Sequence, residues 1–362
     1  MADMIADHIR EVNRGDDGVG NLVFKEDGSL EYVPPGQSAP VGSTAVVTDL
    51  SKPGYAAEAA CPSLLTEEEY YSSVNGAVER DLVRNKYVLV VGAGSVGSKV
   101  MMALVDEGCS HFGVMDNDKV ELHNLSRHVA GVGDIAKLKT DVMEECILRK
   151  NPFAQVEKFP VDVCRNRELL RELMRKADIT ICATDNNASR YVVNSEADQL
   201  GKTVVYCRAE TRAEALNIFV QRPHAACYNC LIAQGGHVEE EITNEASARA
   251  SGTIPSYTSP EDAGVMVQIG LPSDIAPMVN MTVKLVLVEL TRGMEDTGIE
   301  TLAEELSPFN FFVWINHRDR KYHEVPSFAT AGPGPRILRW YGCSIPVREG
   351  CDVCDEDNHA NL

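Results

Sequence analysis

The sequence Tyr87-Val-Leu-Val-Val-Gly-Ala-Gly-Ser-Val-Gly97 decides the fold, because an apolar run leads directly into a glycine-rich turn. The run from Tyr87 to Val91 has no polar alternation and is rich in β-branched residues, as is typical of a strand buried on both faces. After the glycines, apolar residues recur at helical spacing. The order strand, glycine turn, helix predicts a phosphate-binding turn, because glycines allow close approach and the helix dipole favours an anion. The glycines of this G-x-G-x-x-G pattern are Gly92, Gly94 and Gly97.

A second predicted strand, His111 to Met115, ends at Asp116, whose carboxylate can hold a ribose hydroxyl. Further strands and helices alternate along the chain, which predicts an α/β fold with a doubly wound, mostly parallel sheet of the Rossmann type. In such sheets ligands lie outside the carboxyl ends of the strands, so Asp116 and Asp185 are expected to face one crevice. The strands are expected at 155–161, 178–182 and 204–207, and the helices at 134–150, 166–176 and up to residue 200.

The composition limits the classes of protein and of partner. A chain of 362 residues, 44% of them hydrophobic, can bury one large core or two smaller ones. The formal net charge of −20 argues against a nucleic-acid partner, since affinity for phosphate backbones depends on clustered Lys and Arg. No apolar run reaches about 18 residues, which predicts no membrane span. The first residues lack the features of a signal peptide, so we expect a cytoplasmic protein.

Two parts are expected along the chain. Residues 1–60 are rich in turn-forming sequence and are predicted to be an N-terminal extension that holds a small hairpin or is partly disordered. Residues 61–362 contain the glycine turn and are predicted to form one large domain. Within it, about 235–270 is expected to be a long functional loop, because it is rich in Gly, Ser, Thr, Glu and Pro. A C-terminal β extension is expected from apolar runs at 309–315 and 336–341.

Two Cys-x-x-Cys pairs predict a metal site. Cys227 and Cys230 form one pair, and Cys351 and Cys354 form the other, each in a turn-prone sequence. Four thiolates arranged as two pairs are typical of a closed, tetrahedral, structural Zn²⁺ site. Such a site has no open coordination position, so it would tie the C-terminal tail to the core and would not catalyse. Two unrelated thiol pairs, or a redox pair, are the alternatives.

Charged and polar residues follow the glycine turn and predict the chemistry of the bound group. Arg127 and Lys139 lie shortly after the second strand, where the charge of a polyphosphate would need to be neutralised. Asp185, at the end of a parallel strand, could bind Mg²⁺. The glycine turn alone leaves ATP and a nicotinamide or flavin dinucleotide open. The complete set is Asp116, Asp118, Asn124, Arg127, Lys139 and Asp185.

In order and spacing, these motifs together resemble the ThiF/MoeB/HesA adenylyltransferases, relatives of the ubiquitin-activating enzymes. The resemblance covers roughly residues 65–354 and includes the Cys-x-x-Cys pair that precedes Leu231. It implies ATP·Mg²⁺-dependent activation of a carboxylate as an acyl-adenylate, usually at the C-terminal glycine of a ubiquitin-like or sulfur-carrier protein. It also implies a homodimer. Asp116 would hold the ribose; Asn124, Arg127 and Lys139 would contact the phosphates and Asp185 the Mg²⁺.

The chain departs from the family pattern at two places. The family's Arg-Tyr-x-Arg-Gln segment, whose arginine reaches the partner's ATP, is replaced here by a segment that holds Arg80 and Arg84 without the Tyr or Gln. No cysteine lies between Cys230 and Cys343, so we expect adenylation without an enzyme thioester unless Cys343 or another cysteine takes part. Three other functions are weighed: a nicotinamide-dependent oxidoreductase, adenylation of a non-protein carboxylate, and a catalytically silent scaffold subunit.

Overall fold

The computed structural model describes residues 20–24, 30–33, 44–48, 81–210, 213, 215–235, 271–316 and 337–355. The chain divides into two compact units, Met1–Asn75 and Gly76–Leu362, each of which is described by itself. The predicted boundary between residues 60 and 61 and nearly all of the predicted loop at 235–270 lie outside the described residues.

The first unit contains a small antiparallel sheet of three strands, in the order β2-β1-β3. The central strand β1 pairs with both neighbours along its length, so that Asn21 lies opposite Val33 on one side and Val47 on the other. The strands are β1 (Gly20–Phe24), β2 (Leu30–Val33) and β3 (Thr44–Thr48). The N-terminal extension thus contains one strand more than the hairpin weighed from the sequence.

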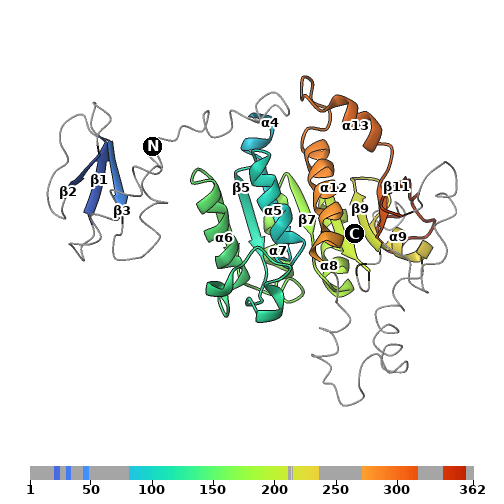
Figure 1. Cartoon of the computed structure of the whole chain (residues 1–362). Helices are drawn as coiled ribbons and strands as arrows, with labels where there is room; N and C mark the ends of the chain where they lie inside the picture. The colour runs from blue at the N-terminus through green and yellow to red at the C-terminus, as the bar shows by residue number, and fades with distance from the viewer. Residues whose placement is uncertain are drawn as a thin grey trace, which may run out of the picture. The chain divides into compact units, whose positions relative to one another are not determined.

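The second unit is built on an eight-stranded sheet in the order β11-β10-β9-β8-β7-β4-β5-β6 (Figure 1). The strands β6, β5, β4, β7 and β8 are parallel, whereas β9, β10 and β11 extend the sheet as antiparallel neighbours. The predicted doubly wound sheet with a C-terminal β extension is therefore confirmed. The bounds are β4 (Tyr87–Val91), β5 (His111–Met115), β6 (Gln155–Phe159), β7 (Ile179–Cys182), β8 (Val204–Ala209), β9 (Ala215–Gln221), β10 (Phe311–Ile315) and β11 (Trp340–Cys343).

Helices cover both faces of this sheet. The side chains of β4 alternate between two cores: Val88 and Val90 pack with helices α5 and α12, and Leu89 and Val91 with helices α7 and α8. Burial of β4 on both faces explains why its sequence is continuously apolar. The helices are α4 (Asp81–Arg84), α5 (Gly97–Asp106), α6 (Lys139–Lys150), α7 (Arg167–Lys176), α8 (Asn187–Leu200), α9 (Tyr228–Gly235), α12 (Pro272–Leu290) and α13 (Glu300–Leu306). Among the described helices, none is long and apolar enough to cross a membrane.

The strand order reverses direction between β4 and β7, and this switch point brings the glycine turn against the end of β7. Gly92 has φ +95°, and a Cβ there would lie 2.9 Å from the carbonyl carbon and oxygen of Ala183. A Cβ on Gly97, the first residue of α5, would lie 2.0 Å from the carbonyl oxygen of Gly92. Both positions therefore need glycine, and the crevice of a doubly wound sheet opens where these two strands part.

One predicted helix begins later than expected. The helix predicted over 134–150 begins at Lys139, and a 3₁₀ turn, Val132–Asp134, precedes it. Ala136 has φ +71°, a left-handed conformation that cannot continue an α-helix. Asp134 stabilises the loop, because its carboxylate accepts hydrogen bonds from the Gly131 backbone N–H and from Lys137 Nζ.

We predict that Gly97→Ala lowers the free energy of unfolding by about 3 kcal/mol or more, because the new Cβ cannot fit against the Gly92 carbonyl. Gly94→Ala is the matched control: a Cβ there meets nothing within 4 Å, so its stability should equal or slightly exceed that of the wild type. Urea denaturation followed by circular dichroism measures both. Equal stability of the two variants would contradict the close packing of α5 on the turn.

Candidate nucleotide and metal sites

A cavity of about 880 Å³ opens at the carboxyl ends of β4, β5, β7 and β8. Its volume is within the range of ligand sites, and it lies at the strand switch point, where doubly wound sheets bind ligands. The structure brings nearly all of the sequence-predicted residues to its wall; Gly97 lies behind the turn and is not among the lining residues. The predicted residues that line the cavity are Gly92, Gly94, Asp116, Asp118, Asn124, Arg127, Lys139 and Asp185.

Asp116, at the end of β5, connects that strand to the glycine turn. Its Oδ2 accepts a hydrogen bond from the Ala93 backbone N–H (2.7 Å), and its Oδ1 accepts one from the Asp118 backbone N–H (2.8 Å). Burial raises the pKa of Asp116, and the positive charge of Lys139 opposes this shift. Each carboxylate oxygen can accept a second hydrogen bond, so Asp116 can hold the turn and still accept one from a ligand hydroxyl.

Lys139 is the basic group that pairs with Asp118 and whose charge acts on Asp116. It is the first residue of α6, its side chain is 11% exposed, and its Nζ lies 2.7 Å from Asp118 Oδ2. Burial acts to lower the pKa of Lys139, but the carboxylates of Asp116, Asp118 and Asp185 outweigh it and the pKa is raised. The ammonium therefore stays charged at neutral pH, beside a helix N-terminus that also favours an anion.

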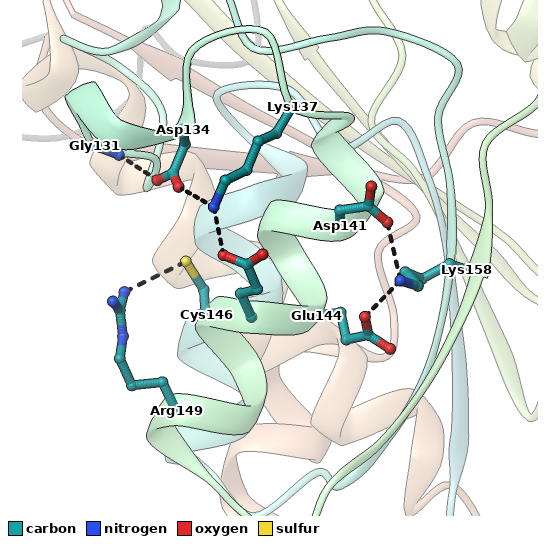
Figure 2. A network of polar contacts seen from close by, with 9 residues as sticks. Gly131, Asp134, Lys137, Asp141, Glu144, Cys146, Arg149 and Lys158 are labelled. Carbon is teal, nitrogen blue, oxygen red and sulfur yellow. Dashed lines mark hydrogen bonds and ion pairs between the residues drawn. The ribbon is translucent and has the colours of Figure 1, made fainter. Parts of the chain in front are cut away.

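A network of ion pairs fixes the segment that carries Lys139 (Figure 2). Before the helix, Lys137 Nζ binds Asp134 at 3.0 Å and Glu145 at 2.8 Å. On the other side of α6, Lys158 of β6 binds Asp141 at 2.9 Å and also binds Glu144, as Figure 2 shows. These contacts join the loop, the helix and the edge strand β6. Lys139 is thus presented from a restrained helix end.

His128 is a residue of the site that the sequence reasoning missed. It is buried, its Nε2 lies 2.7 Å from the Ala93 carbonyl oxygen, and its Nδ1 accepts a hydrogen bond from the Ala130 backbone N–H (2.9 Å). These two contacts require a neutral ring with the proton on Nε2, and burial lowers the pKa of His128 in agreement. His128 thereby positions the glycine turn against the loop that carries Arg127. The sequence signal that could have revealed His128 was its position directly after Arg127.

Asn124 and Asp185 have different surroundings. Asn124 ends a 3₁₀ turn, Leu122–Asn124, and its Oδ1 accepts a hydrogen bond from the Glu121 backbone N–H at 3.0 Å. Asp185 is exposed and lies three residues beyond the end of β7, next to Asn186, the N-cap of α8. An exposed carboxylate at a strand end, close enough to influence Lys139, offers the oxygen ligand that Mg²⁺ prefers. The chemistry of the residue fits a magnesium ligand.

The end of β8 contributes two charged residues that the sequence reasoning also missed. Arg208 and Glu210 both line the cavity and are both buried, with Arg208 Nε 3.3 Å from Glu210 Oε1. Asn217 on β9 donates a hydrogen bond of 2.6 Å to the same Glu210 oxygen. The signal was two charged residues directly after the predicted strand 204–207, since residues at the carboxyl ends of parallel strands face the crevice.

The structure brings the four predicted metal ligands together, one pair from the start of α9 and the other from the C-terminal tail. Their sulfur atoms all lie within 4.8 Å of one another. The Sγ–Sγ distance is 3.6 Å between Cys227 and Cys351 and 3.4 Å between Cys230 and Cys354. Thiolates around a tetrahedral Zn²⁺ lie about 3.8 Å apart, so the cluster fits such an ion. Bound there, the ion would join α9 to the C-terminal tail.

The positions of the remaining cysteines indicate which of them could form a thioester at the cavity. Cys343, which the sequence left open as a thioester cysteine, lies in β11, three strands away from β8, and does not line the cavity. Among the cysteines that the structure describes, Cys164 and Cys207 line it. Burial raises the pKa of Cys207 to about 12, so its thiol is protonated and weakly nucleophilic at neutral pH. Cys164 is exposed, with its Sγ 3.6 Å from Ser189 Oγ.

We predict that Cys351→Ser lowers the melting temperature by roughly 10 °C and reduces bound zinc from one equivalent to none, because metal binding is coupled to folding. Cys343→Ser, outside the cluster, is the control and should keep both. Differential scanning calorimetry and metal analysis by mass spectrometry provide the two readouts. Zinc-free wild-type protein, with a melting temperature that chelators do not change, would contradict the site.

Comparison with known proteins agrees with this arrangement. The model of the ThiF family matches residues 70–326. A sulfur carrier protein adenylyltransferase of Thermus thermophilus is 30% identical over 206 residues, which cover 54% of this chain and 75% of the relative. The adenylyltransferase and sulfurtransferase UBA4 of Eremothecium gossypii is 32% identical over 149 residues, which cover 41% of this chain. The match spans about a third of the length of that UBA4 protein (33%).

Solved structures of other proteins resemble this chain in fold. The E. coli MccB structure with AMPCPP and selenomethionine MccA has a TM-score of 0.51, covering 79% of this chain and 72% of that one at 18% identity. A likeness at this identity supports the architecture alone. The family match spans the glycine turn, the whole cavity and the first cysteine pair, and from these agreements we conclude that the chain belongs to the ThiF family.

Proposed function

We propose that this chain is an ATP-dependent adenylyltransferase that activates the C-terminal carboxylate of a ubiquitin-like or sulfur-carrier protein. The observation that carries the proposal is the shared cavity: the glycine turn, Arg127, Lys139 and Asp185 all line it. The matching adenylyltransferase of Thermus thermophilus is named for a sulfur carrier protein, which supports the class of substrate.

In this proposal the nucleotide lies across the ends of β5 and β4. Asp116 accepts hydrogen bonds from the ribose hydroxyls, and the open space at Gly94, where a Cβ would meet nothing within 4 Å, admits the phosphates. Lys139 and Arg127 neutralise phosphate charge, and Lys139 exchanges part of its contact with Asp118 for a phosphate oxygen. Asn124 adds a polar contact from its 3₁₀ turn.

The proposed reaction is an in-line displacement at the α-phosphorus. A carboxylate oxygen of the carrier forms a bond to the phosphorus, the bond to the bridging oxygen of the β-phosphate breaks, and pyrophosphate leaves with the electron pair. No proton is transferred in this step, so the residues supply charge and position. Asp185 would hold Mg²⁺, which would neutralise charge on the phosphate oxygens. The acyl-adenylate then passes to an acceptor.

Three finer points remain predictions from the sequence. Arg80 lies outside the described residues and Arg84 ends α4 without lining the cavity, so a role across a homodimer rests on the family pattern. A reaction without an enzyme thioester is supported by the distance of β11 from the cavity and by the buried thiol of Cys207. A cytoplasmic location is the third.

The test is calorimetric titration with ATP·Mg²⁺, NAD⁺ and NADP⁺. We expect ATP·Mg²⁺ to bind, and Arg127→Ala to weaken it at least about tenfold, because a charge-assisted contact to phosphate is lost. Asp185→Asn should make ATP affinity insensitive to added Mg²⁺. Arg175→Ala, an exposed arginine of α7 outside the cavity, is the control and should bind like the wild type. Tight binding of NAD⁺ or NADP⁺ in place of ATP would favour the oxidoreductase and overturn the proposal.

A further inference from the structure

We propose that Arg208 and Glu210 form the subsite for the substrate's acyl chain and bind the uncharged peptide unit next to the activated carboxylate. This inference rests on the proposed adenylation and adds the residues that recognise the carboxylate substrate. It begins from a feature the nucleotide does not use: a buried ion pair in the cavity wall at the end of β8.

The position of the pair follows from the strand order. Nucleotide contacts are assigned to the ends of β5 and β4, and the magnesium ligand to the end of β7; β8 is the next strand. Neighbouring strands lie about 4.8 Å apart, so the pair is roughly 10 Å from the glycine turn along the sheet. A carboxylate that attacks the α-phosphorus in line must extend its chain away from the nucleotide. The wall made by β8 is therefore available to that chain.

The charges of the pair select the kind of group that binds. The side chains of Arg208 and Glu210 are 10% and 4% exposed, so each charge is compensated more by the other than by water. An additional anion would meet Glu210, and an additional cation would meet Arg208. A peptide unit carries no net charge and offers a carbonyl acceptor and an N–H donor, which match the guanidinium and the carboxylate. The pair thus favours an uncharged backbone segment over an acidic or basic side chain.

Neighbouring contacts hold both side chains in place. Asn217 donates a hydrogen bond to Glu210 Oε1 at 2.6 Å, and Arg208 is hydrogen-bonded to the Tyr228 side chain. Tyr228 lies between the metal ligands Cys227 and Cys230 and stacks on Tyr206 with ring centroids 4.7 Å apart. The cysteine cluster therefore helps to position the guanidinium at the cavity wall.

Two stable probes separate the subsite from the nucleotide site. One is 5′-O-sulfamoyladenosine, which carries the nucleoside alone, and the other is its N-(acetyl-glycyl-glycyl) derivative, which mimics an acyl-adenylate with peptide units attached. We expect the wild type to bind the peptidyl probe roughly tenfold more tightly, as two added hydrogen bonds allow. In Arg208→Met/Glu210→Gln, which keeps the charge balance, this gain should disappear while the affinity for sulfamoyladenosine is unchanged.

The control is Arg222→Met/Glu289→Gln, which removes an ion pair of 2.8 Å that does not line the cavity and should leave the tenfold gain intact. If the first double variant fails to fold, Arg208→Lys replaces it in the test. This variant retains the charge but loses the two-pronged guanidinium, so it should lose most of the gain in affinity for the peptidyl probe. An equal gain in wild type and variant would overturn this inference and leave adenylation standing. Failure of both probes to bind the wild type would overturn the proposed function itself.

Discussion

The contact between the glycine turn after β4 and the end of β7 is the constraint on which the site depends. Gly92 lies so close to Ala183 that a Cβ would approach the carbonyl group to 2.9 Å, and a Cβ on Gly97 would lie only 2.0 Å from the Gly92 carbonyl oxygen. This packing fixes the start of α5 at the point where the strand order reverses. Asp116 and His128 both bind Ala93, within the same turn, so two further loops are positioned by the same few residues.

The charged residues of the cavity lie at the ends of neighbouring strands on either side of this contact. Asp116 directly follows β5, and the glycine turn follows β4. Asp185 lies three residues beyond β7, and Arg208 and Glu210 lie at the end of β8. Lys139 enters from the restrained start of α6 and stays protonated because three carboxylates surround it. The chain's net charge is −20, yet basic groups gather at this cavity. The same wall also carries six carboxylates, so its charges are nearly balanced, and Arg127, Lys139 and a bound Mg²⁺ would offset the charge of a polyphosphate.

The parts of the fold and site that could be predicted are those with local chemistry. The apolar run of β4, the glycines and the cysteine pairs each depend on a few adjacent residues, and the family match spans all of these except the second cysteine pair. The start of α6 could not be predicted, because apolar periodicity does not reveal the positive φ of Ala136. His128 was missed because its contact with Ala93 joins segments 35 residues apart in the chain. Arg208 and Glu210 were missed because their place at the cavity depends on β8 lying next to β7 in the sheet.

The most direct test of the central claim is a crystal structure of the protein with ATP and Mg²⁺ bound. The proposal requires the ribose hydroxyls within hydrogen-bonding distance of Asp116, the triphosphate against Gly94 and Lys139, and the metal at Asp185. The space beside Arg208 and Glu210 should remain clear of the nucleotide. Adenosine at the end of β8, or a triphosphate outside the cavity, would contradict the account.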